Sequence, residues 1–173
     1  MATTAVEMTT MFTVVDSPIG DLRIVARDGA ITAIEFSPFR PSAIGEPVGT
    51  REDDNPLLRS AADQLAAYFQ RDLKEFDLPL APRGTDFQQR VWEQLREIPF
   101  GKTASYGEIA SRLGMKPGAS RAVGLANGAN PLAIVVPCHR VIGSDGSLTG
   151  YAGGLERKRY LLGLESAKDT LFA

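Results

Sequence analysis

The hydrophobic periodicity of the sequence changes at an extended, proline-containing segment, KEFDLPLAPRGT, residues 74–85. Before this segment, short runs rich in β-branched residues, such as LRIVAR and AITAIEF, alternate with the turn sequences DSPIGD and RDGA. After it, apolar residues recur every three or four positions, as in amphipathic helices. We therefore predict two domains, an α/β domain over residues 1–82 and a mainly helical domain over residues 83–173. Residues 1–11 are expected to be a frayed extension.

Three predicted helices begin at residues whose side chains commonly cap helix N-termini: Asn55, Thr85 and Ser105. Ser105 is followed three residues later by Glu108, which is the signature of a capping box. The helix that it opens and the following segment, ASRAVGLANGANP, are separated by the turn GMKPG. Two short helices around a glycine-containing turn predict a helix-turn-helix-like unit, although many helix pairs share this pattern.

The second helix of this unit carries almost no bulk and no charge after Arg121. Gly124 and Gly128 lower its stability by up to ~1 kcal/mol each relative to alanine. Such a helix has a smooth surface that can approach a narrow groove, and Arg121 is the one long polar side chain near its start. This combination fits an approach to the DNA minor groove. Tight packing against another helix explains the same residues, and both interpretations stay open here.

The distribution of charge favours a polyanionic partner for the second half. Residues 1–82 contain 7 Lys and Arg against 13 Asp and Glu, and residues 83–173 contain 12 against 8, which gives the net charge of -2. Such a split is typical of proteins that bind nucleic acid, with chance as the alternative. No apolar run approaches the ~18 residues that span a membrane, and the N-terminus lacks the pattern of a secretory signal.

The chain has one cysteine and one histidine, Cys138 and His139, adjacent in PLAIVVPCHRVIG. One cysteine forms no internal disulfide, which fits a reducing cytoplasm. The pair is too small for a typical zinc site, so we expect no metal, with a site made of carboxylates as the alternative. A free thiol has a pKa of ~8.5, and a neighbouring imidazole can take its proton. The run AIVV predicts a buried strand that ends at the thiol. Side chains of neighbours in an extended chain point apart, so cooperation requires a turn or a bridging water. A buried cysteine beside a surface histidine is the alternative.

The sequence resembles the O6-alkylguanine-DNA alkyltransferase family. The resemblance covers the C-terminal half in order, through TDFQQRVWEQLREIPFGKTASYGEIASRLG, SRAVGLANGANP, IVVPCHRVIG and GYAGGLERKRYLL, and extends more loosely over the first half, including DSPIG. It implies a small N-terminal α/β domain of ribonuclease H-like fold. It also implies a mainly helical C-terminal domain with a winged-helix-like helix-turn-helix.

The resemblance implies that Cys138 accepts the alkyl group from O6 of a damaged guanine in one displacement, leaving a stable thioether. His139 would take the thiol proton through a water, and Glu165 would orient His139. Many members have a histidine just before this glutamate, whereas this chain has LLGLES. Asn130 would hold the turn between the helix pair and the active-site segment. Arg140 is expected to pair with an acid rather than to contact DNA.

Further site residues follow from the same resemblance. Tyr106 would press on a phosphate, and Arg121 would enter the base stack as the lesion is flipped out. Other DNA contacts are expected along the second helix, at Ala122, Gly124, Asn127 and Gly128. The guanine pocket would be lined by Val141, Tyr151, Ala152, Gly153 and Lys158. Some members have serine at the position of Ala152. Arg157, Lys158 and Arg159 form a basic cluster, with a solvated helix face as the alternative.

We therefore expect a cofactor-free, single-turnover DNA repair protein whose partner is alkylated double-stranded DNA. We expect a monomer, with clustering of copies on DNA as a further option. Three other functions remain as alternatives. They are a lesion binder without alkyl transfer, a DNA-binding regulator that uses the helix pair alone, and a cysteine hydrolase with a Cys-His-Glu triad.

Overall fold

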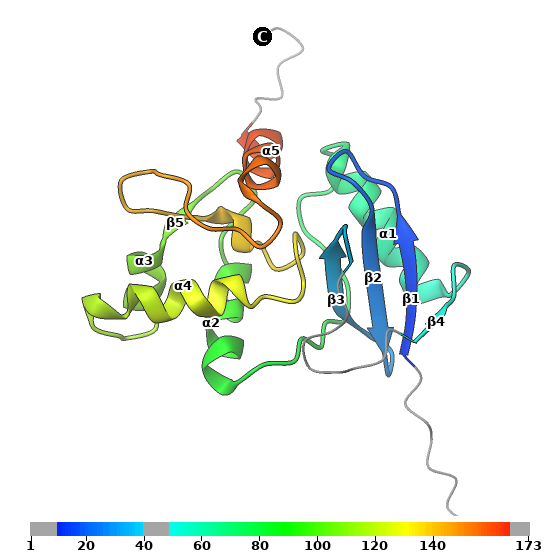
Figure 1. Ribbon diagram of the computed structural model, residues 1–173, viewed down its shortest axis with the longest axis horizontal. Helices are drawn as coiled ribbons and strands as arrows, with labels where there is room; N and C mark the ends of the chain where they lie inside the picture. The colour runs from blue at the N-terminus through cyan, green and yellow to red at the C-terminus, as the bar shows by residue number, and fades with distance from the viewer. Residues whose placement is uncertain (1–9, 40–48, 167–173) are drawn as a thin grey trace, which may run out of the picture.

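The computed structural model describes residues 10–39 and 49–166, and its N-terminal part is a sheet with a helix packed on it (Figure 1). The strand order is β3-β2-β1-β4. Strands β1 (Thr10–Val15), β2 (Leu22–Arg27) and β3 (Ala30–Phe36) are antiparallel neighbours, and the short β4 (Thr50–Arg51) pairs parallel with β1.

The expectation that residues 1–11 form a frayed extension is wrong for the last two of these residues. Thr10 and Met11 belong to β1, where they pair with Arg27 and Ala26. Backbone pairing with β2 and with β4 gives these residues a place in the sheet that no side-chain pattern indicated. Residues 1–9 lie outside the described residues.

Helix α1 (Pro56–Phe69) covers one face of this sheet and contacts β1, β2 and β3. The side chain of Asn55 accepts hydrogen bonds from the backbone of Leu57 and Leu58, which confirms the predicted cap. The helix turns one apolar stripe to the sheet, and its buried residues are Leu58, Ala61, Leu65 and Tyr68. The stripe ends in a tyrosine, whose hydroxyl becomes important for the candidate site.

The C-terminal part contains the helices α2 (Asp86–Arg96), α3 (Tyr106–Arg112), α4 (Ser120–Gly128) and α5 (Leu155–Ser166). Helices α3 and α4 pack against each other, as the predicted helix-turn-helix-like unit requires. The short strands β5 (Ala104–Ser105) and β6 (Val141–Ile142) pair in parallel. Ser105 caps α3 through the backbone N–H of Glu108, while Thr85 and Gln88 form a reciprocal capping box at α2.

The free edge of β3 joins the two parts of the chain. Ile31 exchanges backbone hydrogen bonds with Pro79 and Ala81, and Ile34 does so with Pro131 and Ala133. The linker and the segment that leads to Cys138 therefore lie along the same strand, which leaves less of its edge unpaired. The N-terminal sheet thus supports the backbone just upstream of the candidate nucleophile.

The segment AIVV does not form the predicted strand. Val135 donates its N–H to Ala133 in a tight turn around Ile134, whose φ of 72° is rare for a β-branched residue. Cys138 donates to Val136 in a second tight turn around Pro137, with φ −83° and ψ 65°. The apolar run is buried because protein surrounds it, and burial of this kind looks the same in sequence for a strand and for a coiled segment.

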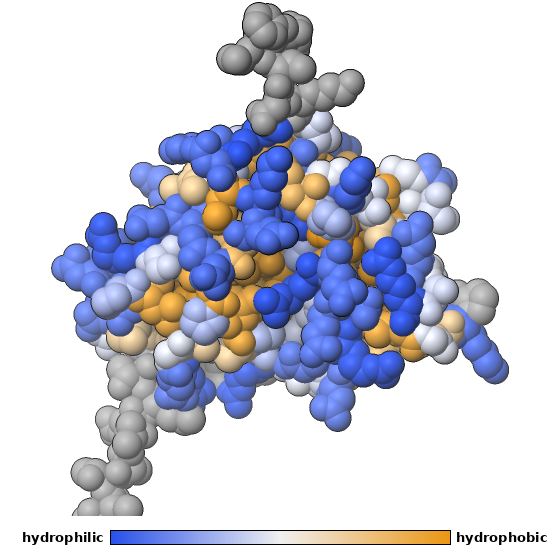
Figure 2. Space-filling view, turned by 180° about the vertical axis from the view of Figure 1, so that it is seen from behind, coloured by the Kyte–Doolittle hydropathy of each residue, from blue (hydrophilic) through white to orange (hydrophobic). Residues whose placement is uncertain are grey.

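The surface seen from behind is largely hydrophilic, with smaller apolar patches between the charged side chains (Figure 2). Among the residues that the structure describes, no helix is long and apolar enough to cross a membrane. Trp92 lies in the core, and its indole N–H donates to the carbonyl of Ala126 at 2.8 Å.

Candidate active site

Cys138 and His139 lie on a single turn of 3-10 helix, Cys138–Arg140, directly after the turn at Pro137. The chain therefore bends at the two residues, which removes the objection that neighbours in a strand point apart. Both side chains are buried, Cys138 with 6% exposure and His139 with none. The alternative of a surface histidine is excluded by this burial.

Asn130 holds the segment that leads to this turn. Its side-chain N–H group donates to the carbonyl of Val136 at 2.8 Å, and its side-chain oxygen accepts from the N–H of Leu132 at 2.9 Å. These contacts match the expected bracing of the turn by Asn130. They fix the backbone through which Ile134 adopts its unusual conformation.

Glu165, on the last turn of α5, is where three side chains converge. His139 Nε2 lies 2.6 Å from Glu165 Oε2, and Arg140 Nε and Nη2 donate to the two carboxylate oxygens at 2.7 and 3.0 Å. Tyr68 Oη donates to Oε2 at 2.6 Å. Arg140 therefore pairs with an acid, as expected. Sequence reasoning missed Tyr68, which is 97 residues away from Glu165.

The protonation states in this cluster follow from burial and charge. Burial alone raises the pKa of Glu165, but the hydrogen bonds and charges of His139 and Arg140 outweigh it and hold the pKa at about 2. Burial lowers the pKa of His139, against the opposing effect of Glu165. At neutral pH, His139 is therefore a neutral imidazole that donates Nε2–H to the carboxylate. Its Nδ1 is buried and has no hydrogen-bond partner among the described residues, so it can accept a proton.

Burial raises the pKa of the Cys138 thiol, and the hydrogen bond of Asn130 and the charge of Lys158 only partly oppose this. The sulfur is thus a protonated thiol at neutral pH. It needs a base to become a nucleophile, and the base beside it in the chain is His139.

The residues expected to line a pocket lie on β6, on the loop before α5 and on α5, and two of them, Tyr151 and Lys158, lie close enough to Cys138 to act on the pKa of its thiol. Tyr151 places its hydroxyl in a buried position without a hydrogen-bond partner among the described residues, and the nearby Cys138 contributes to the raised pKa of Tyr151, after burial. Val141 is fully buried, whereas Ala152 is exposed and Gly153 is half-buried. A side chain at Gly153 would collide with the ring of Phe36.

Lys158 is fully buried and does not belong to a solvated helix face. Its Nζ donates to the carbonyls of Val141 at 2.6 Å and Thr149 at 3.0 Å, and burial lowers its pKa. Arg157 is tied to the N-terminal sheet by hydrogen bonds to the carbonyls of Ile19 and Ser37. Of the expected basic cluster, only Arg159 is exposed.

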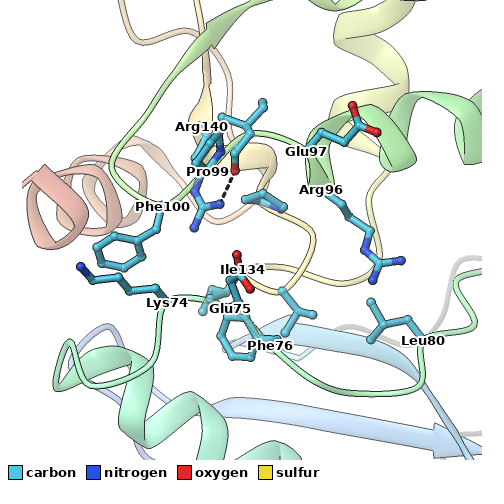
Figure 3. Close-up of a pocket in the computed structure, with 13 residues that line it drawn as sticks. Lys74, Glu75, Phe76, Leu80, Arg96, Glu97, Pro99, Phe100, Ile134 and Arg140 are labelled. Carbon is cyan, nitrogen blue, oxygen red and sulfur yellow. Dashed lines mark hydrogen bonds between the residues drawn. The ribbon is translucent and has the colours of Figure 1, made fainter.

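A cavity of about 450 Å³ is lined by Arg140, by residues of the linker and by the segment just before Cys138 (Figure 3). Neither Cys138 nor Tyr151 lines it, so it is not the pocket that faces the thiol. Arg140 reaches from the cavity wall to the carbonyl of Ile98 at 2.6 Å, the bond drawn in Figure 3, while its other nitrogens hold Glu165. No group of three or more His, Cys, Asp or Glu side chains suited to a metal occurs within residues 10–39 and 49–166.

Helix α4 presents an outer stripe that contains Arg121, Leu125 and Gly128, all exposed. Ala122 and Gly124 are half-buried beside this stripe, and the ring of Tyr106 would lie 3.7 Å from a Cβ atom at Gly124. Tyr106 Oη accepts a hydrogen bond from Thr149 at 3.2 Å.

The expected DNA contact of Asn127 is wrong in its placement. Asn127 is 3% exposed and lies on the inner face of α4, where its amide donates to the carbonyl of Cys138 at 3.4 Å. The outer residues of a helix recur every three or four positions, and Asn127 is out of phase with Arg121, Leu125 and Gly128. Asn127 therefore connects the helix to the turn that carries the thiol.

Comparisons with known proteins agree over both parts of the chain. Residues 10–82 match the family model of the 6-O-methylguanine DNA methyltransferase ribonuclease-like domain, and residues 86–167 match that of its DNA binding domain. The chain is 54% identical over 163 residues to a methylated-DNA--protein-cysteine methyltransferase of Mycolicibacterium paratuberculosis, covering 91% of this chain and 96% of that one. A protein of the same name from Methanosarcina acetivorans is 47% identical, with 90% and 98% covered.

Solved structures give the same result for the fold. The O6-methylguanine methyltransferase of Mycobacterium tuberculosis superposes with a TM-score of 0.83 at 50% identity, covering 94% of this chain and 98% of that one. The protein from this organism described as OGT in complex with DNA gives a TM-score of 0.82 at 50% identity, with 90% and 92% covered. With family models and close relatives matching along nearly its whole length, the chain belongs to the 6-O-methylguanine DNA methyltransferase family.

Proposed function

We infer that the protein repairs DNA by transferring an alkyl group from O6 of an alkylated guanine to the sulfur of Cys138. The observation that carries this inference is the chain of contacts at the candidate site. The one thiol and the one imidazole share a turn, and the imidazole is hydrogen-bonded to a buried, ionised carboxylate. The names of the relatives, methylated-DNA--protein-cysteine methyltransferase, agree with this chemistry.

The transfer is one displacement at the carbon attached to O6. The Cys138 sulfur forms a bond to that carbon as the bond from carbon to O6 breaks, and the electron pair leaves with the guanine. The thiol proton passes to Nδ1 of His139 through a bridging water, and the guanine gains a proton from its surroundings. Glu165 favours this step because it holds the imidazole with Nδ1 free and stabilises the positive charge that forms.

The reaction ends with a thioether, which water does not hydrolyse at a useful rate. The chain has no second cysteine that could exchange with it. Each molecule therefore acts once. The pocket residues Val141, Tyr151, Ala152, Gly153 and Lys158 would receive the guanine, and the buried hydroxyl of Tyr151 can donate to the purine ring as negative charge develops.

Double-stranded DNA would bind along the outer stripe of α4. Arg121 projects from the start of the helix and would fill the space left by the flipped base, while Tyr106 would contact the neighbouring phosphate. Ala122, Gly124 and Gly128 add little bulk, so the helix can approach the minor groove. All groups used here lie on one chain, so a monomer suffices for the reaction. A thiol that must stay reduced fits a location in the cytoplasm.

The test is an intact-mass and peptide-mass measurement after incubation with a duplex that carries one O6-methylguanine. We expect one added methyl group, on Cys138, that saturates at one per protein, and none for Cys138→Ser. Lesion-dependent binding without a mass change would instead support a damage sensor. Repeated turnover of ester or amide substrates would support a hydrolase, and neither binding nor transfer would contradict the proposal as a whole.

A further inference from the structure

The hydroxyl of Tyr68 joins the N-terminal part of the protein to the carboxylate that orients His139. Tyr68 lies on α1, is fully buried, and donates to Glu165 Oε2, the oxygen that also contacts His139 Nε2. Both distances are 2.6 Å. One carboxylate oxygen therefore accepts from a phenol of one half of the chain and from an imidazole and a guanidinium of the other, the guanidinium at 3.0 Å.

The surroundings of Tyr68 fix its ring, so that the hydroxyl has one direction. Edge or tilted ring contacts at 5.3 to 6.0 Å link it to Phe69, Phe76 and Phe100. Phenylalanine would satisfy these apolar contacts equally well. The hydroxyl adds a polar group to a buried position, which is tolerated because the carboxylate accepts its proton. Burial, followed by the charge of Glu165, raises the pKa of Tyr68, so the phenol remains a donor.

A hydrogen-bond donor on Oε2 reduces the charge that the same oxygen offers to His139. Arg140 holds both oxygens of the carboxylate, and the additional bond from Tyr68 restrains its rotation further. The other titratable groups that act on His139 are Arg140 on its own turn and Lys158 on α5, and Tyr160 of α5 acts on Tyr68. Among the described residues, Tyr68 is the side chain that the N-terminal part places in this cluster of titratable groups.

We propose that Tyr68 is a positioning residue for alkyl transfer, which makes the N-terminal part of the chain a component of the relay that takes the thiol proton. This inference rests on the function proposed above. Tyr68 acts through Glu165 and His139 and does not touch the thiol or the base. Its hydroxyl sets how strongly the imidazole is driven to accept a proton.

The test compares the full-length protein with Tyr68→Phe, which removes the hydroxyl and keeps the ring. Because the chain has one histidine, a single imidazole signal in NMR reports the titration of His139 without ambiguity. Loss of the phenol leaves the charge of Oε2 to His139 and Arg140 alone, so the attraction of the imidazole for a proton increases. We expect its titration midpoint, and the acid limb of the single-turnover rate of methyl transfer, to move upward together by about 0.5 pH units or more, roughly a threefold change in proton affinity.

The matched control is Phe76→Leu, which disturbs the same aromatic cluster and leaves the hydroxyl in place. It should lower the melting temperature without moving the His139 titration or the acid limb, and neither variant should change affinity for the duplex. Unmoved profiles in Tyr68→Phe, or equal movement in both variants, would overturn the inference. A wild-type protein that transfers no methyl group would contradict the proposed function, and the His139 titration would still decide the role of Tyr68.

Discussion

Glu165 makes the stability of the fold depend on pH at the scale of one residue. Three side chains donate to its carboxylate, and its pKa falls from the ordinary 4.5 to about 2 although burial works in the opposite direction. A carboxyl group with a lowered pKa stabilises the folded state only while it is ionised. Its contribution is therefore present above about pH 4.5 and is lost as the pH falls through about 2.

We expect the free energy of unfolding to decrease by roughly 3 kcal/mol over this range from Glu165 alone. His139 adds to the loss below about pH 6.5, because burial lowers its pKa and the unfolded chain takes up the proton first. Urea unfolding at a series of pH values measures this. Glu165→Gln should be less stable at pH 6 and should lack the loss between pH 4.5 and 2, and an unchanged acid dependence would contradict the assignment.

Lys158 gives a second prediction at this scale. Its buried ammonium group satisfies the carbonyls of Val141 and Thr149, so Lys158→Met leaves two buried acceptors without a donor. We expect a loss of about 1–3 kcal/mol in the free energy of unfolding. Arg159→Met, the exposed neighbour on the same helix, should stay within about 0.5 kcal/mol. Equal stability of the two variants would show that the contacts of Lys158 are weak.

The residues of the site differ in how visible they are in sequence. Cys138 and His139 attract attention because each is the single member of its kind. Glu165 is one of eight acids in its half, and only the family resemblance indicated it. Tyr68 carried no signal at all, because its role depends on a contact across 97 residues. The resemblance led us to expect Asn127 among the DNA contacts, whereas it lies on the inner face of α4 and bonds the carbonyl of Cys138, a contact that the sequence does not indicate.

At the scale of elements, the exposed stripe of α4 gives a prediction for Arg121. If this side chain fills the gap left by the flipped base, Arg121→Ala should slow transfer from duplex DNA by about 10- to 100-fold, roughly 1.4–2.7 kcal/mol. Transfer from the free base, O6-methylguanine, needs no flipping and should change by less than about twofold. Single-turnover rates with both substrates measure this.

The control for Arg121→Ala is Arg59→Ala, which removes an exposed arginine from α1 on the other part of the chain. It should leave both rates unchanged. An equal loss with duplex and free base in Arg121→Ala would mean that the substitution damages the thiol site itself and that Arg121 has no special part in flipping.

The helices could be predicted from sequence because their signals are local. Caps at Asn55, Thr85 and Ser105 are made by side chains two or three residues from the backbone groups that they satisfy. The prediction that the segment AIVV forms a strand was wrong for the opposite reason. Its tight turns are held by Asn130 and by pairing with Ile34 of β3, and both contacts come from outside the run. The composition of such a run indicates that it is buried, but it does not indicate whether the backbone forms a strand or a series of turns.

At the scale of the whole molecule, the division of charge gives a prediction about salt. The second half carries the basic excess, and the outer stripe of α4 offers no side chains that read base edges other than Arg121. Binding to duplex DNA should therefore depend mainly on phosphates. With about four phosphate contacts, affinity should fall by roughly 100-fold between 50 and 200 mM salt. Titrations with fluorescent duplexes measure this, and an affinity insensitive to salt would contradict it.

The joining of the two parts could not be predicted from the sequence, although their separate architectures could. The change of periodicity at residues 74–85 indicates a sheet part and a helical part. The joint itself consists of the edge of β3, the bonds of Arg157 to Ile19 and Ser37, and the hydroxyl of Tyr68. Each is a pairing between distant residues, which local patterns do not encode.

The burial of Cys138 also affects how long its thiol stays reactive before the protein meets damaged DNA. A molecule that reacts once is lost if its sulfur meets a peroxide or a free alkylating agent first. Such reagents attack exposed thiolates, whereas this thiol is 6% exposed and has a raised pKa. If the protein acts once, as proposed, we therefore expect oxidation to inactivate unused molecules slowly, so that most of them are consumed by the repair reaction.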